Sequence, residues 1–281
     1  MIKRKAKQAN SRGGLLLSLL FVLLILVGGI GCGVFYIYSF CSTIWHEQCQ
    51  VTNPELDVVI STGKMVHPDV VTFHFGLTNG ANLATIPFAQ LREKLLKRVP
   101  NVRDIRIERR LPNRVTVEVI EREPIARIAP LRGHPTEGRV ADSEGIVFWY
   151  NANATTELPI VRESGDSPAA PGKKLTGPTA AALRLVEAAM RPELSDLRVL
   201  EVDTSNQDYL YLTLGNYDHA KFAWEDMLNN SKASRESLHR QLKNLLAVIN
   251  TQLTPHSTVW LATDWEKPSR ITASRPNNVG K

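Results

Sequence analysis

The chain has 281 residues, of which 43% are hydrophobic, and a formal net charge of +6. Five of these charges come from the lysines and arginines before Gly13, so the rest of the chain carries only +1 and presents no basic field for nucleic acid. The length permits one large domain or two or three small ones, and composition alone excludes neither an enzyme nor a binding protein.

A run without charged residues over positions 15–38 predicts a transmembrane helix. Spanning a bilayer takes roughly 20 apolar residues, whereas the apolar region of a cleaved signal peptide, the competing interpretation, is only about 7 to 15 residues long. Lys and Arg are absent between Gly13 and Gly63, so the positive-inside rule places the basic tail, residues 1–14, in the cytoplasm. We therefore expect an uncleaved single-pass anchor, with the chain exported after Tyr38.

Residues 39–53 are predicted to form a short connector after the membrane helix. Cys41 and Cys49 lie in it and are a candidate disulfide, because an exported segment meets an oxidising compartment. No paired cysteine motif and no histidine pair accompanies them, which disfavours a zinc site.

The region that follows is predicted to alternate between helices and strands. Period-two alternation indicates the strands, and apolar residues on one face indicate the second helix. Turn residues separate the elements, among them Thr78-Asn79-Gly80 and Pro112-Asn113. The predicted elements are, in chain order, a strand over 55–61, a helix over 67–77, a helix over 87–99, and strands over 102–110 and 114–121.

The last two of these strands form a hairpin that is rich in charge, written RIERRLPNRVTVEVIEREP over residues 106–124. Its isoleucines and valines alternate with its arginines and glutamates, so one face is apolar and the other charged. Opposite charges across an antiparallel pair contribute about 0.2 to 1 kcal/mol each. We interpret the charges as a solvated outer face rather than as a catalytic or nucleic-acid site.

Beyond Pro124 the pattern predicts short strands interrupted by two helices. Leu158-Pro159-Ile160-Val161 is predicted to be an irregular apolar edge, and residues 163–176 a surface loop. We expect residues 267–281 to be a flexible polar tail. The predicted strands cover 125–128, 139–141, 146–150, 197–203, 209–214 and, as the last strand, 258–263, and the helices cover 179–191 and 234–253.

Several short motifs in this order resemble one family. They are Val99-Pro100-Asn101-Val102 at the start of a strand, Glu121-Arg122-Glu123-Pro124-Ile125-Ala126 at the end of the hairpin, the turn Asp142-Ser143-Glu144-Gly145, and Leu158-Pro159. Together with the basic tail and the single span, they resemble the bacterial cell-division proteins FtsQ and DivIB. Three features depart from the family pattern: a span rich in glycine, the cysteine pair, and the sequence Val259-Trp260-Leu261-Ala262-Thr263 where the family more often has V-D-L-R.

The resemblance implies an α+β fold with a single N-terminal transmembrane helix, a small POTRA domain over 54–123, and a C-terminal mixed β-sheet domain with flanking helices over 124–266. It also implies a non-enzymatic divisome scaffold of the inner membrane at the division septum. Homologues of FtsB and FtsL are the implied partners, bound at the last strand by strand addition. The candidate partner-binding residues are Val259, Trp260, Leu261, Thr263 and Trp265, although Trp260 packing on the helix over 234–253 is an equally good interpretation.

Motifs for other chemistry are absent from the sequence. It has no G-x-S-x-G, no HExxH and no phosphate-cradling glycine loop, so we predict no catalytic, cofactor-binding or metal-binding residues, no cofactor and no small-molecule substrate. Two alternatives stay open: a membrane-anchored enzyme of the cell envelope, and a POTRA-containing assembly or secretion component. A single POTRA-like region without a downstream barrel pattern weighs against the second.

Overall fold

A computed structural model describes the chain in eight stretches, which contain two compact units. The described residues are 11–110, 112–134, 138–155, 157–163, 169–216, 218–251, 258–267 and 270–274. The first unit comprises Met1–Val59, Thr72–Pro87 and Ile107–Val117, and the second comprises Ile60–Val71, Phe88–Arg106 and Glu118–Lys281.

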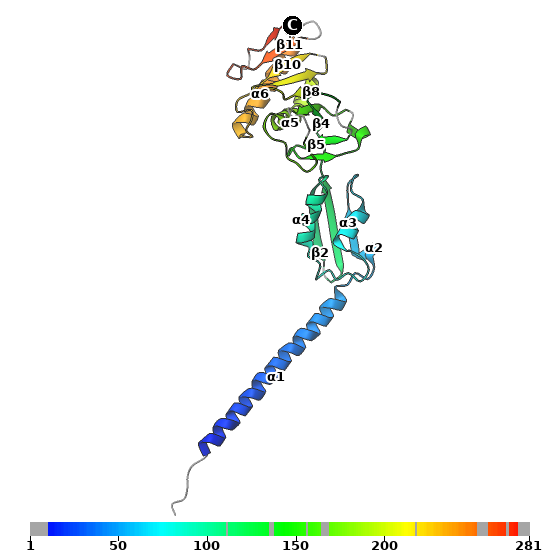
Figure 1. The fold of residues 1–281 in the computed structure, drawn as a ribbon, viewed down its shortest axis with the longest axis vertical. Helices are drawn as coiled ribbons and strands as arrows, with labels where there is room; N and C mark the ends of the chain where they lie inside the picture. The colour runs from blue at the N-terminus through cyan, green and yellow to red at the C-terminus, as the bar shows by residue number, and fades with distance from the viewer. Residues whose placement is uncertain are drawn as a thin grey trace, which may run out of the picture. The chain divides into compact units, whose positions relative to one another are not determined.

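The first element is the long helix α1, Ser11–Gln48 (Figure 1). Its apolar part, Leu19–Thr43, has 25 residues with exposed side chains, and at 1.5 Å per residue it is about 37 Å long, enough to cross a bilayer. The predicted span ended at Tyr38, but the next five residues are also uncharged and continue the helix. The predicted connector over 39–53 is therefore wrong as far as Gln48.

All three cysteines are free, so the candidate disulfide between Cys41 and Cys49 is not formed. Cys41 lies on α1, and Cys49 follows its last residue. Eight residues of helix separate two Cα atoms by about 12 Å, whereas a disulfide joins Cα atoms about 4.4 to 6.8 Å apart. Continuation of the helix through the predicted connector explains why the two thiols are not bonded.

A three-stranded sheet with the order β1-β3-β2 follows α1. The hairpin strands β2 and β3 have the predicted bounds, whereas the predicted strand over 55–61 begins as a helix. Pro54 occupies the first turn of that helix, and the Asn53 side chain accepts a hydrogen bond from the Glu55 amide. The elements are α2 (Pro54–Asp57), β1 (Val58–Ser61), α3 (Pro68–Phe75), α4 (Phe88–Arg98), β2 (Val102–Arg110) and β3 (Arg114–Glu121).

The rest of the chain builds a nine-stranded mixed sheet with the order β12-β11-β10-β9-β8-β7-β4-β5-β6. Neighbouring strands are parallel in the pairs β4–β7, β7–β8 and β10–β11 and antiparallel in the others. The strands are β4 (Ala126–Pro130), β5 (Arg139–Ala141), β6 (Val147–Trp149), β7 (Ile160–Glu163), β8 (Val199–Asp203), β9 (Leu210–Leu214), β10 (His219–Phe222), β11 (Val259–Ala262) and β12 (Thr272–Ser274).

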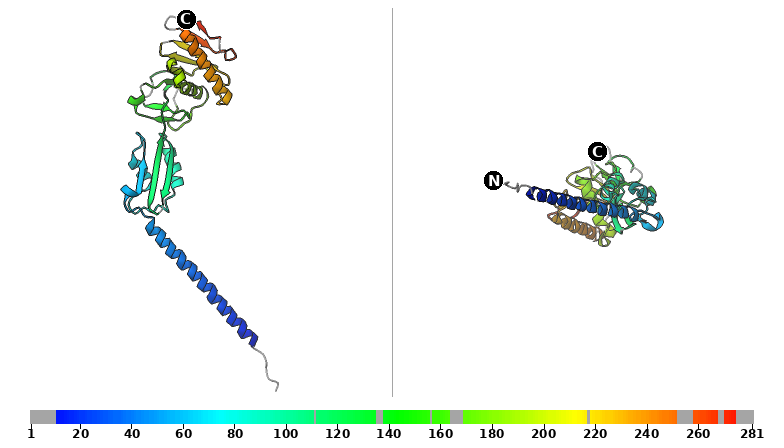
Figure 2. Two further views of the ribbon diagram at one scale, coloured as in Figure 1. Left: turned by 180° about the vertical axis from the view of Figure 1, so that it is seen from behind. Right: turned by 90° about the horizontal axis from the view of Figure 1, so that it is seen from below.

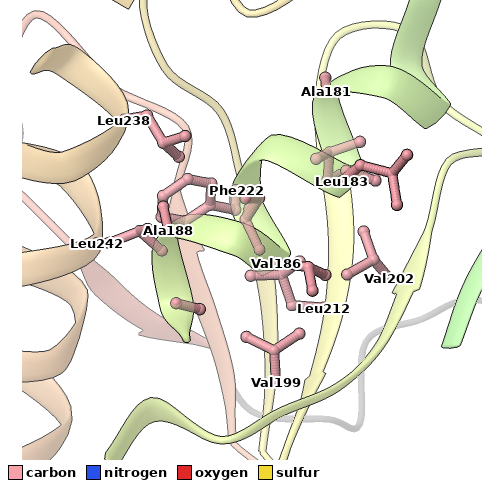
Figure 3. Packing of buried hydrophobic residues seen from close by; sticks show 14 of the residues in the cluster. Ala181, Leu183, Val186, Ala188, Val199, Val202, Leu212, Phe222, Leu238 and Leu242 are labelled. Atoms are coloured by element: carbon pink, nitrogen blue, oxygen red, sulfur yellow. The ribbon is translucent and has the colours of Figure 1, made fainter. Parts of the chain in front are cut away.

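Two helices and two short 3₁₀ turns accompany this sheet. The two helices are drawn beside the strands in Figures 1 and 2. Leu183 and Val186 of α5, Leu242 of α6, and Phe222 and Leu212 of the sheet belong to one buried cluster (Figure 3). Full burial of side chains of this size contributes about 1.5 to 3 kcal/mol each, so the cluster holds the helices on the sheet. The helical elements are α5 (Gly177–Ala189), α6 (Lys232–Thr251), η1 (Ala152–Thr155) and η2 (Pro192–Leu197).

Three strands of this sheet were not predicted. The segment expected to be an irregular edge contains β7, which pairs in parallel with both β4 and β8 and so lies inside the sheet. The strand β10 was missed, and β12 lies within the predicted flexible tail, so that prediction is wrong for Thr272–Ser274. Residues 275–281 of the tail lie outside the described residues.

Candidate functional site

The strand β12 is the terminal strand of the nine-stranded sheet. Its inner side pairs antiparallel with β11, with Thr272 opposite Leu261 and Ser274 opposite Val259. No other strand among the described residues pairs with its outer side, and Thr272 and Ala273 are exposed. An edge strand of this kind presents backbone N–H and C=O groups that can pair with another chain.

A buried aspartate fixes the strands beside this edge. The Asp218 carboxylate accepts hydrogen bonds from the Thr258 amide at 3.0 Å and from the Trp260 indole Nε1 at 3.2 Å. It accepts a third from Asn216 Nδ2 at 2.8 Å. Because Asp218 directly precedes β10, and its donors Thr258 and Trp260 precede or belong to β11, the carboxylate holds the two parallel strands in register.

The helix α6 anchors β11 from the covered face of the sheet. Gln241 of α6 is buried and donates through Nε2 to the Ala262 carbonyl oxygen at 3.0 Å. The Trp260 side chain is fully buried, and Ile271, directly before β12, is also buried. The edge strand is thus attached to a rigid base while its own outer side stays open.

The five predicted partner-binding residues have different positions around this edge. Val259 and Trp260 are buried in β11, Leu261 is half-buried there, and Thr263 follows the strand as an exposed residue. Trp265 is 39% exposed. The last predicted strand, which is β11, does not have a free edge on this side, because β12 pairs with it.

The residues of β12 itself were missed by the sequence reasoning. A signal was present, since Ile271-Thr272-Ala273-Ser274 is a short segment with β-branched residues after a polar turn. It was outweighed by the polar residues on either side, which are typical of a tail.

The strand β6, at the opposite edge of the sheet, is covered. The Val147 amide donates to the Lys173 carbonyl oxygen at 3.0 Å, and the Gly172 amide donates to the Val147 carbonyl oxygen at 2.7 Å. The Asn101 side chain donates to the Trp149 carbonyl oxygen at 2.7 Å. These contacts occupy backbone groups that a partner strand would need.

Glu121 and Arg122, at the end of the charged hairpin, were predicted to lie on a solvated face, but both are held by other groups of the protein. The Glu121 carboxylate accepts from the backbone amides of Lys64, Met65 and Val66 at 2.9, 3.0 and 2.7 Å. The Arg122 guanidinium pairs with Asp142 and, at 3.1 Å, with Glu144. Hydrogen bonds from Arg122, and then from Arg103, lower the pKa of Glu144.

The charges further along the hairpin are solvated as predicted. Arg106 and Glu118 form an exposed pair across the two strands at 3.3 Å. Arg110 pairs with Glu108 on the same strand at 3.0 Å, and both side chains are exposed. The sequence interpretation therefore applies to the body of the hairpin but not to its C-terminal end.

The described residues contain no group of three or more His, Cys, Asp or Glu side chains arranged to hold a metal ion. The buried carboxylates of Asp142 and Asp218 are instead occupied by hydrogen bonds from neighbouring groups. The backbone N–H and C=O groups at the β12 edge can hydrogen-bond to the backbone of another chain.

Residues 57–122 match the family model described as "POTRA domain, FtsQ-type". No curated protein matches the chain. The matched stretch contains the three strands of the three-stranded sheet, β1, β2 and β3, and the two helices α3 and α4, which lie between β1 and β2 in sequence. Residues 57–122 are therefore a POTRA domain of the FtsQ type, which is consistent with the predicted membership of the chain in the FtsQ/DivIB family.

Proposed function

We propose that this protein is a non-enzymatic, membrane-anchored scaffold of the bacterial divisome. The observation that carries the proposal is the open β12 edge in a chain with an FtsQ-type POTRA domain. In this proposal residues 1–14 are cytoplasmic, α1 anchors the chain in the inner membrane, and the exported region acts at the division septum. The POTRA domain spans 54–123, and the sheet domain that begins at residue 124 includes β12.

The proposed mechanism is addition of a partner strand to the outer side of β12. Main-chain hydrogen bonds along Thr272–Ser274 supply affinity, and side chains beside the edge supply specificity. Trp265 and Thr263 are exposed close to it in sequence and serve as the candidate side-chain contacts. The expected partners are the host's FtsB and FtsL homologues.

A pair of truncations of the full chain tests this mechanism. Ending the chain after Ile271 removes β12, whereas ending it after Ser274 keeps β12 and removes only the residues behind it. Co-purification from membranes with the FtsB and FtsL homologues should be lost in the first variant and kept in the second. Equal binding by both would contradict a role for β12.

The cellular role is tested separately by depletion. If the protein is a divisome scaffold, depleting it in its host should block septation while chromosome replication continues. Normal septation after depletion would refute the role in division, whatever the truncations show about strand addition.

A further inference from the structure

Two adjoining cavities lie along α5, away from the β12 edge. Their volumes are about 600 and 280 Å³, and they share Ser143, Arg184 and Asn230 as lining residues. The walls come from the Asp142–Gly145 turn, from α5 and the residues just before it, and from α6 and the loop that precedes it. We call the two cavities together the α5 groove.

Four basic side chains line the α5 groove: Lys174, Arg184, Arg191 and Arg235. No ion pair joins any of them to a carboxylate among the described residues. Arg184 Nη2 donates to the Met227 carbonyl oxygen at 2.7 Å, and Arg235 Nη1 donates to the Asn230 carbonyl and side-chain oxygens, both at 3.1 Å. Their charges are therefore uncompensated by direct contact.

The most enclosed of these cations is Arg184. Its burial lowers the pKa of the guanidinium, and Asp226 only partly opposes that shift from a distance. Two other arginines of the second unit that lose solvent are each paired with a carboxylate: Arg122 with Asp142, and Arg162 with Glu201 at 2.6 Å. A partly desolvated cation without a counter-ion favours binding of an anion from outside.

The acidic groups that face the groove do not cancel its charge. Glu144 is already held by Arg122 and Arg103, at 3.1 and 2.8 Å. Glu187 is the other lining carboxylate, and His239 lies 3.8 Å from Glu193. Four cations thus face one carboxylate, that of Glu187, which forms no ion pair among the described residues, so the groove is net positive.

We propose that the α5 groove binds an acidic peptide segment of a partner protein. The volume exceeds what a single phosphate fills, and the amide side chains of Asn229 and Asn230 can hydrogen-bond to a peptide backbone. Leu228, which is 50% exposed, lines the same cavity and offers an apolar contact that a bare anion does not use. The groove is separate from β12, so this inference goes beyond the proposed function.

Calorimetric titration of the full chain in detergent micelles tests the proposal with three probes. They are a hexapeptide that alternates Glu or Asp with Leu, the same peptide with Gln and Asn in place of the acids, and inorganic phosphate. The acidic peptide should bind, and the neutral peptide should bind at least about tenfold more weakly, a difference of about 1.4 kcal/mol. Equal binding of both peptides, or tighter binding of phosphate, would overturn the assignment.

Charge variants locate the binding. The double change Arg191→Gln with Arg235→Gln should weaken the acidic peptide about tenfold or more, because charge-assisted hydrogen bonds are lost. Arg240→Gln is the matched control, since Arg240 is an exposed arginine of α6 that does not line the groove. Unchanged tryptophan fluorescence and melting temperature would verify the fold of both variants. Equal losses in the double variant and the control would refute a specific groove.

Peptide binding at the α5 groove can be tested independently of strand addition at β12. The chain that ends after Ile271 should still bind the acidic peptide, because every lining residue precedes residue 240. Loss of peptide binding in that truncation, with the fold intact, would contradict a separate site on α5.

Discussion

At the β6 end of the nine-stranded sheet a buried aspartate forms an ion pair with an arginine, whereas at the β12 end a buried aspartate accepts hydrogen bonds from uncharged donors. Asp142 pairs with Arg122 and accepts from the amides of Glu144 and Ile146, at 3.1 and 2.8 Å. Asp218 accepts from a backbone amide, an indole and a side-chain amide, and no cation lies within ion-pair distance of it among the described residues.

The two edge strands also differ in whether their outer sides are covered. Gly172 and Lys173 hydrogen-bond to β6 and occupy its outer side, while the outer side of β12 is open. A covered edge resists pairing with other chains, and an open one invites it. Both ends of the sheet are therefore anchored from within, but only the β12 end is available for assembly.

The largest effect is expected for Asp142→Ala. It leaves the Arg122 side chain, only 13% exposed, without its main partner, and removing one member of a buried ion pair costs about 3 to 5 kcal/mol. Urea unfolding followed by tryptophan fluorescence would measure the loss in the free energy of unfolding. Ser143→Ala, at the exposed neighbouring position, should change it by less than about 0.5 kcal/mol. A loss below about 1 kcal/mol for Asp142→Ala would show that the pair is not the anchor of the β6 end.

A smaller loss, of about 2 to 3 kcal/mol, is expected for Asp218→Ala. The change leaves buried donors on Thr258 and Trp260 without this acceptor, but it leaves no buried charge without a partner. Asp218→Asn keeps one acceptor oxygen and should lose less. Binding of the FtsB and FtsL homologues should fall in the alanine variant, because β11 supports β12. A stability loss equal to that of Asp142→Ala would erase the proposed contrast between the two ends.

The elements that the sequence predicted well are those specified by local patterns. The strands β2 and β3 alternate strictly about a Pro112-Asn113 turn, and their bounds were predicted without error. The helices α5 and α6 follow apolar stripes and were displaced by only about two residues at each end, which is ordinary for helix ends.

The elements and contacts that were missed depend on partners distant in sequence. The strands β7 and β10 have only four residues each. β7 is parallel to both of its neighbours, β4 and β8, so no hairpin turn reveals it. β10 is antiparallel to β9, but its other neighbour, the parallel strand β11, is distant in sequence. The pairing of Arg122 with Asp142 and the amides held by Glu121 likewise join separate segments. At the candidate site, the tryptophans suggested β11, but the free edge belongs to β12, which only strand pairing reveals.

A third test concerns the covering of β6. Gly172 has a φ of +84°, in the left-handed region, and its amide hydrogen-bonds to Val147. Gly172→Ala should cost about 1 to 2 kcal/mol because a Cβ is unfavourable there, although its nearest neighbour, Pro100 Cγ at 3.5 Å, is an ordinary contact. Gly172→Asn should cost less, since Asn tolerates this conformation better. Melting temperatures would compare the two, and an equal drop would point to lost packing instead of backbone strain.

The smallest effect is a pH dependence confined to the β6 end. Hydrogen bonds from Arg122 and Arg103 lower the pKa of Glu144 below its ordinary value of 4.5, so the folded state binds this proton less readily than the unfolded state. The stabilisation is therefore complete above about pH 4.5 and is lost as the pH falls through the folded-state pKa. Because the Glu144 side chain is 43% exposed, solvent screening limits the effect to about 0.2 to 1 kcal/mol.

The variant Glu144→Gln tests this pH dependence. It should reduce the slope of the free energy of unfolding against pH between pH 5 and 3. Glu123→Gln, at an exposed position two residues after Glu121, should leave that slope unchanged. Identical slopes in both variants would place the acid sensitivity elsewhere and remove charge pairing as a difference between the two ends of the sheet.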